Sequence, residues 1–135
     1  MKLDWIRVQP SLSSGKYWEG CSREVLLIQR CDDCHAAQFY PRRICSNCWS
    51  KNLSWIETGR TGEVYSHTTV HRAPSMEFKA IVPYVLVYVK LAHDLLILGF
   101  LEPDASRGPV KIGDRVEMRF EEIGDNRRLP VFRAL

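Results

Sequence analysis

The sequence reads CDDC at residues 31–34 and CSNC at residues 45–48. Two residues separate the cysteines of each pair, and ten residues separate the two pairs. A two-residue gap lets both thiolates of a pair reach one metal ion at about 2.3 Å, and a tight hairpin can bridge the longer gap. We therefore predict one structural zinc ion, bound by Cys31, Cys34, Cys45 and Cys48.

Four thiolates complete a tetrahedral zinc site and leave no position for water or substrate, so we expect no catalysis at this metal. Chance spacing, a disulfide pair and an iron–sulfur cluster are the alternatives. His35 and Trp49 follow the second cysteine of each pair, where zinc knuckles often carry a glycine with positive φ. Histidine tolerates that backbone region passably and tryptophan only at a cost. His35 is not needed as a ligand because four thiols suffice.

The composition is that of an ordinary soluble globular protein, with 135 residues, 45% hydrophobic and 26% charged. The longest apolar stretch, Leu95–Leu101, is far shorter than the roughly 20 residues that a membrane span requires. The opening residues MKLDWIRVQP lack the apolar core of a signal peptide. We therefore expect a cytoplasmic protein without membrane contact, in which cysteines stay reduced and close pairs bind metal.

The net charge of +3 is distributed unevenly along the chain. Residues 1–60 contain nine Lys/Arg and six Asp/Glu, whereas residues 61–135 contain ten of each. A protein that neutralises a nucleic-acid backbone usually presents a dense basic face. The balanced charge of the second part therefore argues against nucleic acid as the partner.

Cys21 is the fifth cysteine and lies outside the paired motif, between Trp18 and Val25. A reactive cysteine requires a base and a basic environment. The surrounding residues indicate a packing segment instead, so we interpret Cys21 as a buried structural thiol.

The chain divides into an N-terminal helical segment at 1–24, a zinc ribbon at 25–58 and a barrel domain at 59–135. A short helix is plausible within 11–22, where Tyr17, Trp18 and Cys21 recur at helical spacing. From Gly59 onward, apolar residues alternate with polar ones, which is typical of strands. The expected strands are 63–70, 84–91, 95–101, 115–120 and 130–133, with a small ribbon hairpin around 38–41. Five short strands predict a mainly β protein whose C-terminal part is a closed OB-fold barrel.

The strand at 84–91 is apolar on both faces. One face fills the barrel, and the other is covered by the ribbon, by the helix or by another protein. We predict a partner surface around the outward side chains of this strand and the loop before it. Its candidate residues are Tyr84, Leu86, Tyr88, Met76 and Phe78.

Arg42, Arg43 and Arg60 lie near the boundary between ribbon and barrel. A guanidinium group matches the geometry of a phosphate, so these arginines are candidates for binding an anion. An ordinary solvated surface is the alternative.

A set of short motifs spread over residues 13–132 resembles one known family, the zinc-ribbon/OB-fold proteins that accompany thiolase-like and acyl-CoA enzymes. That family was long catalogued as a domain of unknown function. The matching segments are Tyr17-Trp18-Glu19-Gly20, Gln29-Arg30-Cys31, Phe39-Tyr40-Pro41-Arg42, Leu53-Ser54-Trp55, Gly59-Arg60-Thr61-Gly62-Glu63-Val64-Tyr65-Ser66, Pro83-Tyr84, Leu98-Gly99, Ile112-Gly113-Asp114 with Val116, and Pro130-Val131-Phe132. The cysteine pairs belong to the same resemblance.

The resemblance implies an N-terminal helix, a rubredoxin-like zinc ribbon and an OB barrel in a small subunit without catalytic residues of its own. It also implies a thiolase-superfamily enzyme, or an acyl-CoA hydratase, as partner, and a coenzyme A thioester as ligand. A nucleic-acid-binding module is the second hypothesis, because zinc ribbons and OB folds both support that function. A self-sufficient enzyme that uses Cys21 or a histidine is the third.

Overall fold

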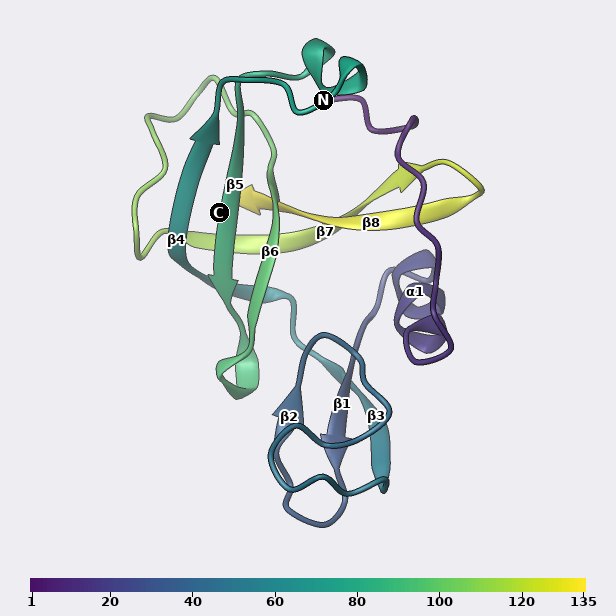
Figure 1. Cartoon of the computed structure of the whole chain (residues 1–135). Coiled ribbons are helices and arrows are strands. Elements are labelled where there is room, and N and C mark those ends of the chain that lie inside the picture. The colour runs from purple at the N-terminus through teal and green to yellow at the C-terminus, as the bar shows by residue number, and fades with distance from the viewer.

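The computed structural model describes residues 1–135 as a helix, a small sheet and a barrel. Helix α1 spans Gly15–Ser22 and precedes a three-stranded sheet ordered β2-β1-β3. Its strands are β1 (Leu26–Cys31), β2 (Ala37–Gln38) and β3 (Leu53–Thr58). Figure 1 shows this sheet, the ribbon, extending away from the barrel, with α1 beside the junction of the two.

Five strands, paired mostly antiparallel, close into the barrel in the order β4-β5-β6-β8-β7. They are β4 (Thr61–Val70), β5 (Tyr84–Lys90), β6 (Leu96–Leu101), β7 (Arg115–Ile123) and β8 (Arg127–Ala134). Closure includes one parallel contact, between Leu101 of β6 and Phe132 of β8. Closing the sheet pairs its edges, which in an open sheet invite aggregation. The predicted fold class is thus confirmed, with β7 and β8 longer than their sequence patterns indicated.

Gly62 explains how β4 can pass so close to β5 at the lower end of the barrel. A β-carbon at this position would lie 2.3 Å from the carbonyl oxygen of Lys90. No side chain is compatible with that approach, so the strand requires glycine there. The register between β4 and β5 also shifts between Val64 and Ser66, which bends β4 as it passes between the two strands it pairs with.

The ribbon differs from the expected hairpin around residues 38–41. The strand β2 ends at Gln38, and its partner is β1, through the pair Gln29 and Gln38. Phe39 and Tyr40 leave the sheet and pack against Tyr17 of α1, with ring centroids 5.3 and 5.6 Å away. The aromatic contacts with the helix, rather than local strand propensity, determine where β2 ends.

One apolar core crosses the boundary between the ribbon and the barrel. Leu26 and Ile28 of β1 are fully buried in the same cluster as Val87, Val89 and other barrel residues. A smaller cluster fastens the N-terminal segment to the barrel, because Leu3, only 1% exposed, packs with Ile123 and Val131. None of the helices is long and apolar enough to cross a membrane.

Candidate functional site

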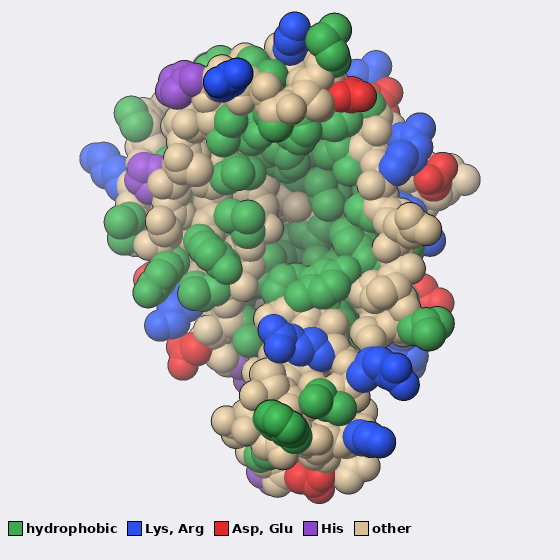
Figure 2. Space-filling model, viewed as in Figure 1, with side chains coloured by type: hydrophobic (Ala, Val, Ile, Leu, Met, Phe, Trp, Pro, Cys, Tyr) green, Lys and Arg blue, Asp and Glu red, His purple; other side chains and the backbone are tan.

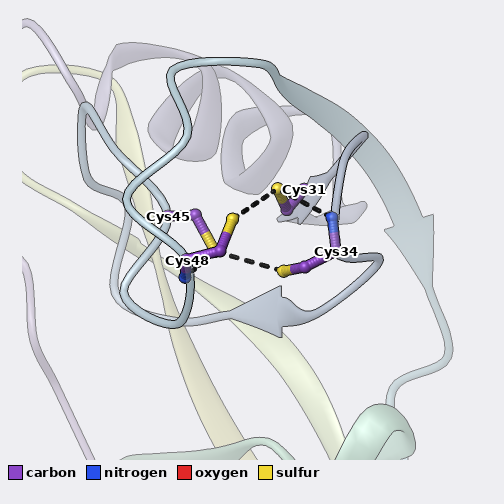
Figure 3. Close-up of side chains that lie close together, drawn as sticks. All are labelled: Cys31, Cys34, Cys45 and Cys48. Carbon is purple, nitrogen blue, oxygen red and sulfur yellow. Dashed lines mark hydrogen bonds between the residues drawn. The ribbon is translucent and has the colours of Figure 1, made fainter.

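Four cysteine sulfurs, from the end of β1 with the turn after it and from the loop between β2 and β3, gather in one cluster (Figure 3). Their Sγ atoms all lie within 4.8 Å of one another. The Sγ atoms of Cys31 and Cys48 are 3.6 Å apart, as are those of Cys34 and Cys45. A tetrahedron with Zn–S bonds of about 2.3 Å has sulfur–sulfur edges of about 3.8 Å, so this cluster has the size that zinc requires.

Hydrogen bonds from the chain to the sulfurs favour thiolates at this site. The backbone N–H of Cys34 lies 3.4 Å from Cys31 Sγ. In the second pair, the N–H groups of Asn47 and Cys48 lie 3.3 and 3.5 Å from Cys45 Sγ. Such donors orient metal-binding groups and disperse their negative charge. The backbone is therefore arranged to carry deprotonated sulfur.

The pKa values of two of the clustered thiols shift in opposite directions. The Asn47 side-chain amide, and after it the Ala36 backbone, lower the pKa of Cys34 to about 6. The pKa of Cys48 rises to about 12 although the Ser50 backbone lowers it, because packing against the neighbouring sulfurs removes hydration from this otherwise exposed thiol and favours its protonated form. Closely packed thiolates repel one another, so a bound cation is needed to keep all four ionised.

The residues after each cysteine pair occupy the left-handed region of the backbone map. The φ angles are 65° for His35 and 68° for Trp49. The same turn is made in both pairs, since the N–H of His35 donates to Cys31 O and that of Trp49 to Cys45 O, each at 3.0 Å. The sequence accepts two non-glycine residues where the turn favours glycine.

Two buried glutamines support the loop that carries the second cysteine pair. Gln29 accepts a hydrogen bond from the Arg42 N–H at 2.8 Å and donates to the Arg42 carbonyl at 2.7 Å. Gln38 accepts from the Ser46 N–H at 2.8 Å and donates to Gln29 at 2.7 Å. Sequence reasoning missed this role, although a glutamine inside the apolar run of β1 was a signal for it.

Cys21 is separate from the metal cluster and is fully buried in α1. Burial raises the pKa of its thiol to about 12, against a smaller lowering by a hydrogen bond with Tyr17. The thiolate is the nucleophilic form of cysteine, so Cys21 is unreactive in the folded chain.

An apolar groove of about 340 Å³ lies between the barrel, α1 and the ribbon. Figure 2 shows hydrophobic side chains lining a hollow on this face, directly above the ribbon, with Lys and Arg side chains near its lower end. Exposed apolar groups along the groove include Tyr40 and Tyr88, each 42% exposed, and Leu98, 58% exposed. The Trp18 indole donates to the Tyr40 hydroxyl at 3.0 Å, which fixes one wall.

The five predicted interface residues have different surroundings. Tyr88 lines the groove, and Met76 is 73% exposed in the 3-10 helix Met76–Ala80. Phe78 and Leu86 are half-buried. Tyr84 is only 8% exposed because its ring packs against Phe78 and Phe100 of the chain itself. The outer face of β5 is therefore open to a partner at Tyr88 and covered internally at Tyr84.

The three candidate arginines are free of carboxylate partners. Arg42 and Arg43 are exposed, Arg60 is half-buried, and none belongs to the eight ion pairs of the chain. The Arg60 guanidinium lies 5.8 Å from the ring centroid of Phe120, a cation–π contact that orients it at the start of the barrel. Arg42 follows the groove residue Tyr40 by two positions.

A larger cavity of about 810 Å³ opens at the barrel end where the N-terminus, the segment before β5 and the β6–β7 loop meet. Its lining mixes Lys2, Arg107 and Lys111 with Asp4, Glu102, Asp104 and Asp114. An anion would meet several carboxylates there. The groove at the ribbon junction is smaller but lined almost entirely by apolar residues.

The fold and the cysteine cluster define a zinc-ribbon protein with an OB barrel. Two protein-family models match the chain: the rubredoxin-like zinc ribbon domain of ChsH2 at residues 18–54, and the C-terminal OB-fold domain of ChsH2 at residues 55–121. A DUF35 domain-containing scaffold protein of Methanocaldococcus jannaschii is 32% identical over 77% of this chain and 73% of its own length. The chain belongs to the DUF35 family.

Two further relatives are named as subunits of enzymes. The benzoylsuccinyl-CoA thiolase subunit BbsA of Geobacter metallireducens is 27% identical over 76% of this chain and 66% of its own length. A probable enoyl-CoA hydratase alpha subunit of Thermomonospora curvata is 30% identical over 95% of this chain. This chain spans only 40% of that hydratase subunit.

Among solved structures, a chain of the Ltp2-ChsH2(DUF35) aldolase superposes with a TM-score of 0.81 and 28% identity. The superposition covers 95% of this chain and 98% of the other. The helix, ribbon and barrel are thus arranged similarly in both.

Proposed function

We propose that this chain is a non-catalytic accessory subunit of a cytoplasmic acyl-CoA-processing complex. In this proposal it binds a thiolase-superfamily enzyme, an acyltransferase, thiolase or aldolase, and helps to position the coenzyme A thioester. The observation that carries the proposal is the match, over 95% of this chain and 98% of the other, to a chain of the Ltp2-ChsH2(DUF35) aldolase. The relatives named scaffold protein and thiolase subunit support the same role.

The apolar groove is the proposed contact with the enzyme. Tyr88, Leu98 and Tyr40 are partly exposed and line one continuous groove, whereas scattered exposed apolar residues would not form such a surface. Aromatic side chains that are already held in place lose little entropy on binding and are common anchors of interfaces. Met76 and Phe78 are proposed as a further contact near the other end of β5, where the Phe78 ring packs against Tyr84.

The unpaired arginines are the proposed contacts for the phosphates of coenzyme A. Arg60 lies at the start of the barrel, and Arg42 and Arg43 follow the groove residue Tyr40. Because no carboxylate neutralises them, their guanidinium groups are available for charge-assisted hydrogen bonds with phosphate oxygens. The apolar groove, which includes Tyr40 two positions before Arg42, would then accommodate less polar parts of the thioester.

Zinc has a structural role in this proposal. When bound, it links the two cysteine pairs and so fixes the loop between them, which carries Tyr40 and Arg42. The four thiolates fill its coordination positions, so the substrate does not bind to the zinc ion. Catalysis would therefore belong to the partner enzyme.

A hydratase is the second candidate partner. The similarity to the hydratase alpha subunit of Thermomonospora curvata extends over 95% of this chain, so one observation favours it specifically. That subunit has a further region beyond the part matched here, which can account for its activity. The same groove would serve as the contact in either case.

The test is co-purification of this chain with the thiolase-superfamily or hydratase enzyme encoded in the same genome, followed by assays of each component and of the mixture. We expect a stable hetero-oligomer, activity in the complex, and none in this chain alone. An enzyme that is equally active and equally stable without this chain would contradict the proposal.

Two matched pairs of variants locate the contacts. Tyr88→Asp is expected to weaken the complex, whereas Tyr65→Asp is not, because Tyr65 is 56% exposed on β4 outside the groove. Arg60→Glu is expected to raise the KM for the thioester. Arg72→Glu, on the loop after β4, serves as its control. Zinc content should be unchanged in all four variants.

A further inference from the structure

The cavity of about 810 Å³ at the end of the barrel has no role in the proposed function. Figure 1 shows the N-terminus and the 3-10 helix Met76–Ala80 together at the end of the barrel opposite the ribbon. Both contribute walls to the cavity, and the β6–β7 loop contributes another. Cavities of this size hold small molecules in many proteins, and the mouth of a β-barrel is a common place for them.

The floor of the cavity is the end of the barrel core. Val116 is fully buried there. Val85, Leu101 and Val110 pack against the same core cluster but are only half-buried, because they face the cavity. Trp5, also half-buried, adds an aromatic wall. Covering such side chains removes apolar surface from water, so the floor favours a ligand with an apolar body.

Contacts within the chain hold the walls of the cavity in place. The ring of Trp5 lies 4.9 Å from the ring of Phe78, and the Trp5 indole donates to Lys2 O at 3.0 Å. In the β6–β7 loop, the Lys111 N–H donates to the Asp114 carboxylate at 2.9 Å. The cavity is therefore largely formed in advance, as small-molecule sites usually are.

The charged side chains of the lining cancel one another. Arg107 pairs with Asp104 at 3.3 Å, and Glu102 pairs with Arg119 at 2.7 Å. The other charged side chains of the lining belong to no ion pair, and they are two lysines and two aspartates: Lys2, Lys111, Asp4 and Asp114. A charged ligand would lose hydration and meet groups of its own sign beside groups of the opposite sign. The balance of charge therefore favours an uncharged ligand.

We propose that this barrel-end cavity binds an uncharged, mainly apolar small molecule. The apolar body of the ligand lies against Val85, Leu101 and Val110, and its polar groups face the lysine and aspartate side chains of the rim. The cavity shares no lining residue with the groove at the ribbon junction. This inference thus goes beyond the proposed function and does not depend on it.

The test uses the full chain and two fluorescent probes that differ by one charged group. N-phenylnaphthylamine is uncharged and apolar, and anilinonaphthalene sulfonate carries a sulfonate on the same ring system. We expect the uncharged probe to bind with one molecule per chain, and the sulfonate to bind about tenfold more weakly because its charge has no partner in the cavity. Failure of the uncharged probe to bind, or an equal or higher affinity for the sulfonate, would overturn the proposal.

Variants in two different walls locate the bound probe. Gly108 lines the cavity, and a β-carbon at this position meets no atom within 4 Å, so Gly108→Trp fills space without displacing the chain. Ala80→Trp does the same from the exposed end of the 3-10 helix. Both variants should melt as the wild type does and should bind the uncharged probe more weakly. Gly59→Trp is the matched control, because Gly59 is equally unobstructed but lies outside the cavity.

A groove variant separates this site from the proposed enzyme contact. Tyr88→Asp should leave the affinity for the uncharged probe unchanged, since Tyr88 lines only the groove. Loss of probe binding in Tyr88→Asp, with wild-type binding in Gly108→Trp and Ala80→Trp, would show that the groove holds the probe. That result would overturn this inference and leave the proposed function standing.

Discussion

Among the four clustered cysteines, the first of each pair, Cys31 and Cys45, is more deeply buried than the second. Cys31 and Cys45 are at most 1% exposed, while Cys48 lies at the surface. Each receives a backbone N–H bond that favours its thiolate form. The metal thus bonds to sulfurs that the ribbon already surrounds. Replacing one of them removes a ligand and also leaves a polar hydroxyl in a buried position.

We predict that Cys31→Ser loses the zinc ion and unfolds the ribbon, because a hydroxyl poorly replaces a thiolate. Zinc in such sites contributes on the order of 10–16 kcal/mol to folding at neutral pH. Metal analysis should give one zinc per wild-type chain and none in the variant. Cys21→Ser is the control and should retain the metal. An iron absorption band in the wild-type protein would contradict the assignment of zinc.

The buried thiol of Cys21 gives a prediction about reactivity and pH. Because its pKa is raised to about 12, folding favours the protonated form, and this contribution to stability is lost as the pH rises from about 9 to 12. Below that range, iodoacetamide should leave Cys21 unmodified in the native protein and modify it in denaturant. Peptide mass spectrometry distinguishes the two states. Rapid labelling of native Cys21 at pH 8 would show that it is accessible.

At the scale of elements, the glutamine pair determines whether the loop after β2 can form the second half of the metal site. We predict that Gln38→Leu destabilises the chain by about 1–3 kcal/mol, the cost of leaving a buried group such as the Ser46 N–H unpaired. It should also weaken the affinity for zinc at least about tenfold, as changes to residues that support metal ligands typically do. Urea unfolding and a chelator competition measure both effects. Gln9→Leu, at an exposed position, is the matched control.

The sequence predicted the elements whose pattern is local and missed those that depend on distant contacts. Most barrel strands were predictable because short apolar or alternating runs are bounded by turn residues, and the cysteine cluster because its spacing is short. The sequence pattern did not predict the strands β1 and β3, since both depend on pairing across the metal loops. The departure of Phe39 and Tyr40 from the sheet requires Tyr17 of α1 as a partner. The covering of Tyr84 by Phe78 likewise follows from tertiary packing alone.

For the whole molecule, the distribution of charge leads to a prediction about nucleic acid. Residues 61–135 contain ten basic and ten acidic side chains, and several of them pair with one another, as in Arg133 with Glu117 and Arg119 with Glu102. We expect no tight binding of single-stranded DNA or RNA at physiological salt. A fluorescence anisotropy titration measures this. Sub-micromolar affinity that falls steeply with added salt would favour the nucleic-acid hypothesis over the accessory subunit.

The shared core makes the ribbon and the barrel one cooperative unit. Leu26 and Ile28 of β1 belong to one buried cluster with Val87 and Val89 of the barrel, so loosening β1 exposes barrel residues as well. Removal of zinc should therefore lower the melting temperature of the barrel too. A decrease of several kcal/mol in the free energy of unfolding lowers the melting temperature by roughly 10 °C or more for a chain of this size.

The measurement is thermal unfolding with and without a chelator, followed by far-ultraviolet circular dichroism, which reports the barrel strands, and by the fluorescence of the tryptophans near the junction. We expect one transition by both probes when zinc is present, and a joint shift when it is removed. Val87→Ala provides an independent check. Val87 is not a zinc ligand, but the cavity that this change leaves in the shared core should accelerate the release of zinc from the ribbon. A barrel transition unmoved by the chelator would mean that the ribbon folds separately, and that its metal stabilises only the ribbon.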